Sequence, residues 1–387
     1  MSKKVFFIFF ITIIISFPFL NLIESKADKE IFFNKTLMTF NGVLNARNAD
    51  ELIYRLTRYV NEHSFLKKEM IEFRSSLIYR FLNTTASPNI LRTNEDWLFK
   101  INLDYYSPKK IKRMKHYIDN NITNYFKILQ EYCKRNGIEF HLVIAPSREF
   151  IHNEKTAPYI SSKRKLTPNG KSLFFDFLNN KELNIIDLHP IINSYKNNER
   201  LYNKFDIHWN GLGSYIGFEY LISRMNKEEF SLNLGEFSYR RKNKLTGIFA
   251  REIGLQNTLL DTDIEVIEDF EGKTILDTYY NDTFNFNIPK QHLPFTVKNP
   301  KKQKSVVFYH DSYGQQFSRY FGKHFKETYF ISPWYHSIAK NWNHCYLNPE
   351  VLLRKKPDIF IFQLILKRLL VNLESCKPYL ESLNLNN

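Results

Sequence analysis

The sequence predicts an α/β fold with a mostly parallel sheet, and two observations indicate it. Short apolar runs recur between stretches of helical periodicity, at residues 138–147, 184–192, 304–314, 328–334 and 358–366. Their hydrophobicity is continuous rather than alternating, which is typical of strands that helices cover on both faces. Strands that alternate with helices favour a parallel sheet, and functional residues gather at the carboxyl ends of such strands.

Composition and charge limit the classes of protein to which the chain can belong. Its 387 residues, 43% hydrophobic and 16% aromatic, exclude a mainly disordered protein and allow one large domain or two ordinary ones. The net charge is +15, but the lysines alternate with glutamates, as in residues 67–74. We therefore expect no nucleic-acid binding, and a basic surface that faces anionic lipid or polymer.

The amino terminus predicts export. Lys3 and Lys4 precede an uncharged apolar run at residues 5–23, and small residues at Ser25 and Ala27 offer a cleavage site. This pattern is typical of a signal peptide or a membrane anchor, which we assign to residues 1–27. We expect the remaining chain outside the cytoplasm, in the periplasm or at the cell surface, either released or held to the membrane through residues 5–23.

The cysteines and the spacing of possible metal ligands indicate no catalytic role. Cys133 lies in a helical pattern and reads as an unpaired, buried thiol, while Cys345 and Cys376 are candidates for one disulfide. No C-x-x-C or H-E-x-x-H spacing occurs, so we expect no metal site.

Before the first strand, the sequence predicts a helical extension over residues 28–94. Apolar residues recur at helical spacing over 48–82 and predict one or two helices that pack on something else. The breaker at 83–89 leads to a short β-like segment with a turn at 94–96. The main domain, assigned to residues 95–387, starts there and continues into a long helix over about 108–135.

Within the main domain, residues 231–303 interrupt the alternation of strands and helices. They are polar and mixed in charge, with short β-like pieces at 263–270 and 283–289. We interpret this segment as an insertion or lid rather than a second domain.

A candidate nucleophile follows the third strand. Ser312 stands in the turn of His310-Asp311-Ser312-Tyr313-Gly314, ahead of a predicted helix at 315–325. A serine at the carboxyl end of a strand projects its hydroxyl, and backbone N–H groups of such a turn can bind an oxyanion. Serine needs an adjacent base, which a histidine supplies when an acid fixes its tautomer.

Asp206 and His208 meet this need ahead of a helix that begins at Gly211. In extended backbone, residues two apart face the same side, separated by about 6.6 Å. The carboxylate would then reach Nδ1–H while Nε2 points outward, and the following helix start keeps Asp206 ionised. The alternative is a capping acid beside a buried imidazole; the presence of Ser312 favours catalysis.

Six short motifs in order resemble the AlgX/AlgJ group of SGNH hydrolase-like proteins, extracytoplasmic polysaccharide O-acetyltransferases. The resemblance covers about residues 50–370. The motifs are EDWLF (95–99), LVIAPSREFIHNEKTAPY (142–159), DIHWN (206–210), LTGIFAREIGL (245–255), HDSYG (310–314) and PDIFIFQLILKRLL (357–370).

The resemblance implies a flavodoxin-like three-layer sandwich and a triad of Ser312 as nucleophile, His208 as base and Asp206 as orienting acid. It also implies that a polytopic membrane O-acyltransferase supplies the acetyl group, so that no cofactor is needed. The sequence departs from the family in several places. His310 replaces a glycine, Arg148 stands where a lysine is usual, and Gln363 and Lys367 stand where acids are frequent. The oxyanion blocks of true SGNH hydrolases are not assignable.

Further candidate residues carry two interpretations each. Trp209 stacks on a sugar ring or packs at the helix start. Arg148 contacts an anionic glycan or pairs near Glu149. Tyr313 and Gly314 are candidates for the oxyanion site, and His310 either narrows the serine turn or adds a second imidazole.

Three functions stay open on the sequence. The first is an O-acetyltransferase that acts on an exported or cell-surface polysaccharide through an acetyl-serine intermediate. The second is a carbohydrate acetyl-esterase, because the same triad serves both and water exclusion decides between them. The third is a non-catalytic glycan-binding or assembly component.

Overall fold

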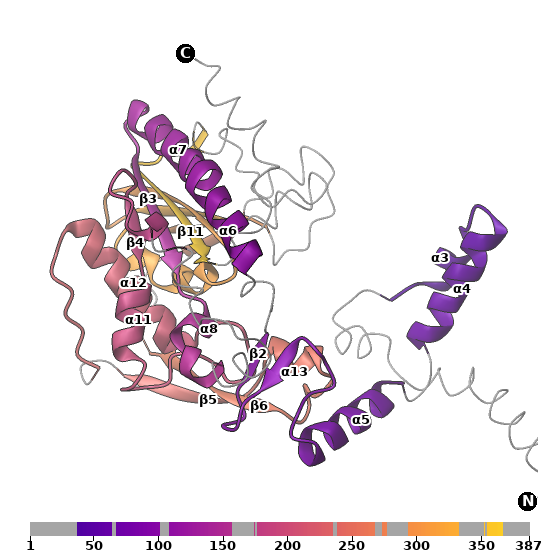
Figure 1. Ribbon diagram of the computed structural model, residues 1–387. Coiled ribbons are helices and arrows are strands. Elements are labelled where there is room, and N and C mark those ends of the chain that lie inside the picture. The colour runs from indigo at the N-terminus through magenta and orange to yellow at the C-terminus, as the bar shows by residue number, and fades with distance from the viewer. Residues whose placement is uncertain are drawn as a thin grey trace, which may run out of the picture. The chain divides into compact units, whose positions relative to one another are not determined.

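The computed structural model describes residues 37–63, 67–100, 108–156, 174, 176–234, 238–267, 273–276, 293–332, 352 and 354–366. The chain divides into two compact units (Figure 1). Unit 1 comprises Met1–Ile101, Lys204–Asp206 and Lys244–Asp261, and unit 2 comprises Asn102–Asn203, Ile207–Asn243 and Thr262–Asn387. The predicted domain boundary at residues 94 and 95 falls inside unit 1, which also takes in two later stretches of the chain.

Unit 2 contains the sheet that the sequence predicts, with strand order β4-β3-β11-β9-β10-β8-β7. The first five strands are mutually parallel, and β8 and β7 extend the sheet antiparallel. The strands are β3 (Glu139–Ala145), β4 (Ile185–Asp187), β7 (Lys273–Leu276), β8 (Phe295–Lys298), β9 (Ser305–His310), β10 (Glu327–Ile331) and β11 (Ile359–Ile365). All five predicted strands are therefore present, in an α/β fold with a mainly parallel sheet.

Helices cover both faces of this sheet. Figure 1 shows α6 (Pro108–Tyr117) and α7 (Thr123–Arg135) on one side, and α11 (His189–Tyr195) and α12 (Gly211–Asn226) on the other. The predicted helix over 108–135 is thus confirmed, with a π-helical segment at Ile118–Ile122 joining its two halves. Helix, sheet and helix make the three layers of the expected sandwich.

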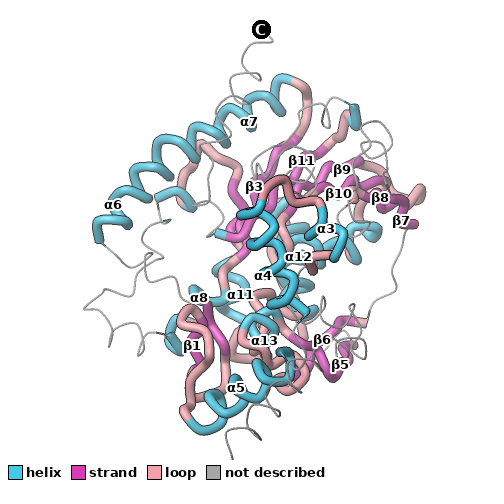
Figure 2. Tube along the Cα trace, turned by 90° about the vertical axis from the view of Figure 1, so that its right-hand side faces the viewer, coloured by secondary structure: helices cyan, strands magenta, loops and turns pink. Residues whose placement is uncertain are grey.

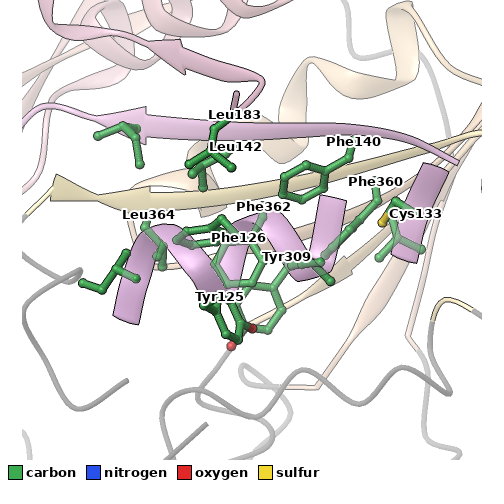
Figure 3. Packing of buried hydrophobic residues seen from close by; sticks show 14 of the residues in the cluster. Tyr125, Phe126, Cys133, Phe140, Leu142, Leu183, Tyr309, Phe360, Phe362 and Leu364 are labelled. Atoms are coloured by element: carbon green, nitrogen blue, oxygen red, sulfur yellow. The ribbon is translucent and has the colours of Figure 1, made fainter. Parts of the chain in front are cut away.

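The core beneath α7 is aromatic (Figure 3). Phe126 of α7 packs edge-on against Phe362 of β11 with ring centroids 5.3 Å apart, and Phe140 of β3 lies in the same cluster. Because side chains alternate along a strand, the residues between these point to the opposite face. Gln363 and its register partner His310 on β9 accordingly lie on the α12 side of the sheet.

Two predicted elements differ from the structure. The strand expected over 184–192 ends at Asp187, because Pro190 stands in the first turn of α11 and cannot continue a strand. The helix expected after Ser312 is instead two short 3₁₀ helices, η4 (Gly314–Arg319) and η5 (Phe321–Lys323).

Part of the predicted insertion at 231–303 belongs to the sheet rather than standing apart from it. Its strands β8 and β7 pair with β10 and with each other. Two further strands, β5 (Tyr239–Thr246) and β6 (Leu260–Val266), form a separate two-stranded sheet. The predicted β-like piece at 283–289 lies outside the described residues.

Unit 1 holds the predicted amino-terminal helices. They are α3 (Phe40–Leu44), α4 (Ala49–His63) and α5 (Lys67–Phe81), which confirms the helical period over 48–82. The hairpin of β1 (Ile90–Arg92) and β2 (Leu98–Lys100) turns at Asp96, whose φ of 61° is left-handed. The short helix α13 (Ile248–Glu252) completes the unit, and Figure 2 colours these elements by type.

The membrane segment expected at residues 5–23 lies outside the described residues. Among the helices that the structure describes, none combines the length and apolar character needed to cross a bilayer.

Candidate active site

The turn that carries Ser312 is fixed by the buried carboxylate of Asp311. Its Oδ1 accepts a hydrogen bond from the Tyr313 N–H at 2.9 Å, and its Oδ2 accepts one from the Ile365 N–H at 2.7 Å. One side chain therefore closes the turn and ties it to the carboxyl end of the neighbouring strand β11. Asp311 is an important residue that sequence reasoning missed, although the Asp-Ser pair was visible in the motif.

Ser312 and His208 lie in direct contact. Nε2 of His208 is 2.8 Å from Oγ of Ser312, and both side chains are partly exposed. A neutral imidazole that carries its proton on Nδ1 accepts the seryl hydroxyl proton at this distance. The structure thus brings together two residues that stand 104 positions apart in the chain.

Tyr313 fastens the loop of His208 to the serine turn. Its hydroxyl donates to the backbone carbonyl of Ile207, and its own carbonyl accepts the Nε1–H of Trp209 at 3.2 Å. The Tyr313 ring also lies against the His208 ring, with centroids 5.1 Å apart. Through these contacts, Tyr313 holds the backbone beside His208 against the turn that carries Ser312.

Trp209 packs in the interior rather than facing a substrate. Its indole is fully buried and stacks on Phe317 with centroids 5.3 Å apart. On α12, Gly217 leaves the space that the indole occupies, since a Cβ there would lie 3.4 Å from the ring, and a Cβ at Gly213 would lie 3.1 Å from the Trp209 Cβ. The sugar-stacking interpretation of Trp209 is wrong, because no part of the ring is accessible.

Asp206 is buried, and its surroundings differ from the sequence-based expectation. Its Oδ2 accepts a hydrogen bond from the Ile248 N–H at 2.8 Å, at the start of α13 in unit 1. The chain bends at residues 206–208 instead of running extended, so the expected same-side geometry of residues two apart does not apply. The role of Asp206 as the orienting acid stays a prediction.

Arg148, like Trp209, is buried in the interior of the protein. It begins α8 (Arg148–Ile151), is 1% exposed, and donates from Nη1 to the Asn203 carbonyl. Nearby, the Tyr202 hydroxyl donates to the Pro146 carbonyl at 2.9 Å. A glycan cannot reach this guanidinium, so the substrate-binding interpretation of Arg148 is wrong for the described conformation.

Burial keeps the two tyrosines near Arg148 neutral. It raises the pKa of both Tyr202 and Tyr313 well above the ordinary value. Each phenol is therefore a hydrogen-bond donor at neutral pH.

The two candidates for the oxyanion site, Tyr313 and Gly314, differ in what their backbone and side chains contact. The Tyr313 N–H donates to Oδ1 of Asp311 at 2.9 Å, which leaves it directed at the turn, and its role at the oxyanion site stays a prediction. Gly314 is needed for close packing, because a Cβ there would lie 2.3 Å from Oε1 of Gln363 and 2.7 Å from Cβ of His310. The backbone of Gly314 stays a candidate donor.

The His310 side chain contacts the backbone of the serine turn, and this favours the structural interpretation of His310 over a second catalytic imidazole. Its Nδ1 lies 2.8 Å from the Asp311 carbonyl and must donate, since a carbonyl only accepts. Burial lowers the pKa of this imidazole, which keeps it neutral. Beside it, Gln363 is fully buried, and neither of its amide atoms has a hydrogen-bond partner among the described residues.

The possible metal-ligating side chains and the described cysteine can be located in the structure. In that part of the chain, no three His, Cys, Asp or Glu side chains gather as metal ligands would. Cys133 is a free thiol buried in the α7 core, and burial raises its pKa to about 12. Cys345 and Cys376, the predicted disulfide partners, lie outside the described residues.

Comparison with known proteins confirms the resemblance. Residues 90–263 match a family model described as an SGNH hydrolase-like domain of the acetyltransferase AlgX. The matched stretch contains Asp206 and His208 and ends before Ser312. A search of curated proteins found no match.

Solved structures share the fold. A DHHW family protein from Eubacterium siraeum is 14% identical, with a TM-score of 0.51 over 78% of this chain and 97% of its own. Bacillus cereus PatB1 is also 14% identical, with a TM-score of 0.50 over 72% and 96% of the two chains. A second PatB1 structure, with a sulfonyl adduct, is 16% identical with a TM-score of 0.50 over 72% and 95%. At these identities the likeness concerns the fold alone.

Proposed function

We propose that this SGNH hydrolase-like domain, similar to that of the acetyltransferase AlgX, is an extracytoplasmic O-acetyltransferase. It would move acetyl groups onto hydroxyls of an exported or cell-surface polysaccharide through an acetyl-serine intermediate. The observation that carries the proposal is the 2.8 Å contact between Nε2 of His208 and Oγ of Ser312. The family description supports acetyl transfer as the class of reaction.

In the first half-reaction, Oγ of Ser312 attacks the acetyl carbonyl of the donor while Nε2 of His208 takes the hydroxyl proton. The tetrahedral intermediate collapses, the C–O bond to the donor alcohol breaks, and His208 returns the proton to that alcohol. Acetyl-Ser312 remains.

In the second half-reaction, a sugar hydroxyl of the acceptor gives its proton to Nε2 of His208 and attacks the acetyl-serine carbonyl. The ester bond to Ser312 breaks, and His208 protonates the seryl oxygen. The acceptor leaves as an acetyl ester, so both protons and the acetyl group are accounted for without a cofactor.

Asp206 and Gly314 complete the proposed machinery. Asp206, two residues before His208, is the proposed partner of Nδ1–H, which would hold the proton off Nε2. The Gly314 N–H is the proposed oxyanion donor. Both roles come from the residue types and the resemblance, and variants must test them.

The proposed partners follow from the same reasoning. The acetyl donor would be presented by a membrane-bound O-acyltransferase, and the net charge of +15 suits an anionic polymer as acceptor. Residues 5–23 would supply an amino-terminal membrane contact or an export signal.

The test is to incubate the full chain with a chromogenic acetyl ester and follow both ester cleavage and the protein mass. We expect one added acetyl group on Ser312, no adduct in Ser312→Ala, and at least a thousandfold slower acylation in His208→Ala. A sulfonyl fluoride should block the wild type, as the PatB1 sulfonyl adduct suggests. Ser318→Ala is the matched control, because this serine of η4 only bonds the nearby Gln315 carbonyl.

An acceptor oligosaccharide then separates the candidate functions. Acetylated sugar supports the transferase, while release of acetate alone, at a rate independent of the sugar, supports the acetyl-esterase. If the wild type neither cleaves the ester nor forms the adduct but still binds glycan, the protein is a binding component and the proposal fails.

A further inference from the structure

Helix α5 presents an apolar stripe to solvent, although the sequence pattern predicts that this stripe packs on another element. The stripe consists of Met70, Phe73, Leu77 and Phe81, which are 68%, 65%, 41% and 77% exposed. At 3.6 residues per turn, the four side chains fall within about 80° of the helix circumference. Four large apolar side chains aligned in this way form a contiguous patch of a kind that marks an interaction site.

The opposite side of α5 is already anchored within unit 1. Ser75 and Tyr79 are buried, the Tyr79 hydroxyl donates to Asp96, and the Arg92 guanidinium lies 3.7 Å from the Tyr79 ring centroid. Glu72 accepts hydrogen bonds from Asn257 and Thr258 at 3.2 and 3.1 Å. The helix is therefore held by one face, and the orientation of the apolar stripe is fixed.

The charges beside the stripe favour one kind of partner. Arg74 and Arg80 are exposed, and each lies about 20° beyond one edge of the stripe on the helix circumference. Long basic side chains that border an apolar face are typical of helices lying in a membrane interface, where they extend to the phosphate groups. Both borders of the stripe therefore carry a side chain that can reach lipid phosphates while the stripe lies against the acyl chains.

The rest of the chain agrees with a lipid partner. The uncharged apolar run at residues 5–23 lies on the amino-terminal side of α3, α4 and α5, and the net charge of +15 draws the protein to an anionic surface. We propose that α5 lies in the interface of an anionic bilayer, with Met70, Phe73, Leu77 and Phe81 at the acyl boundary and Arg74 and Arg80 at the phosphates. This inference does not depend on the proposed acetyl transfer.

The test places a tryptophan in the stripe and measures quenching by lipids with brominated acyl chains. The full-length Phe73→Trp variant is reconstituted in vesicles of phosphatidylcholine with about one third phosphatidylglycerol, and the signal of the unsubstituted protein is subtracted. Leu260→Trp is the matched control, because Leu260 is an exposed apolar residue of unit 1 outside α5. Any anchoring by residues 5–23 is common to both variants, so their difference reports on α5.

We expect the tryptophan at position 73 to be quenched at least twice as strongly as that at 260. Adding Arg74→Gln and Arg80→Gln should at least halve this quenching. Equal quenching of the two positions, or equal quenching in vesicles of phosphatidylcholine alone, would overturn the proposal. Emission from position 73 that is already shifted to the blue without lipid would also overturn it, because the stripe is then covered by protein.

Discussion

At the scale of single residues, the hydroxyl of Tyr313 has a specific task beside the nucleophile. It donates to the Ile207 carbonyl and so holds the residue just before His208 against the serine turn. Burial raises the pKa of this phenol well above the ordinary value, so it donates as a neutral group at neutral pH. Tyr313 is thus a positioning residue, which acts on the reaction through His208 without touching substrate.

We predict that Tyr313→Phe lowers kcat on a chromogenic acetyl ester about tenfold and leaves KM nearly unchanged, because a loosened His208 costs orientation rather than binding. The loss in free energy of unfolding should be about 1 kcal/mol, as for one hydrogen bond. Tyr320→Phe is the control, since this buried phenol donates to the Gly211 carbonyl at 3.5 Å, at the start of α12. Equal kcat values in the two variants would refute the positioning role.

Gln363 is a second residue whose surroundings make a clear prediction. Its amide is fully buried and finds no hydrogen-bond partner in the part of the chain that the structure describes, and a buried unpaired amide costs about 1 to 3 kcal/mol. We expect Gln363→Met, which keeps the side-chain length, to leave the free energy of unfolding unchanged or raise it by about 1 kcal/mol in urea titrations. A loss above about 2 kcal/mol would mean that the amide is bonded in solution.

At the scale of elements, α12 determines where the histidine loop can lie. Asn210 caps the helix by accepting the Gly213 N–H at 2.9 Å, and the isolated bridge between Tyr202 and Trp209 closes the loop that precedes it. The two glycines that face Trp209 differ in the space around them. A Cβ at Gly213 would lie 2.4 Å from the Leu201 carbonyl oxygen, whereas one at Gly217 would meet side chains, the Trp209 ring at 3.4 Å and Leu188 Cδ1 at 3.5 Å.

This difference gives a matched pair of substitutions on one helix. Gly213→Ala should lower the free energy of unfolding by 2 kcal/mol or more, in the ~1–3 kcal/mol range of overpacked sites, because backbone cannot yield cheaply. It should also slow acylation, since the His208 loop must shift. Gly217→Ala should be neutral or stabilising, because alanine is about 1 kcal/mol better than glycine in a helix. Thermal unfolding and ester kinetics of both variants check this; similar behaviour would contradict it.

The elements were predictable from sequence to the extent that local patterns determine them. Continuous apolar runs identified β3, β9, β10 and β11, and the 3.6-residue period identified α4 and α5. The contacts of Tyr313 with Ile207 and Trp209 join residues more than 100 positions apart, and no period reveals such contacts. Burial selects the structural one of the two interpretations given for Trp209 and for Arg148, because a residue type indicates what a side chain can bind but not whether a substrate can reach it.

At the scale of the whole molecule, the protonation of buried histidines links stability to pH. His141, His152 and His310 are each buried, and burial lowers the pKa of all three imidazoles from the ordinary value of 6.5. For His152 the folded-state pKa falls to about 4, even though Glu154 favours the charged form. The folded protein therefore holds these rings neutral where the unfolded chain already binds protons.

The sign of the effect follows from proton uptake. Above about pH 7.5 the three rings are neutral in both the folded and the unfolded state. Their protonation therefore takes nothing from the free energy of unfolding there. As pH falls below 6.5, the unfolded chain takes up protons first and the free energy of unfolding drops, until the folded-state pKa is reached near 4 for His152. With these two pKa values, His152 alone should account for a loss of about 2 kcal/mol between pH 8 and pH 5.

Urea titrations of the full chain at pH 8, 6.5 and 5 measure this loss directly. We expect the midpoint to fall across the series, and to fall less in His152→Phe, whose ring replaces the imidazole without a titrating group. The variant need not match the wild type at pH 8, because only the change with pH carries the prediction. Parallel pH dependence in the two proteins would show that His152 titrates normally in the folded state, and hence that water reaches a ring which is 6% exposed in the structure.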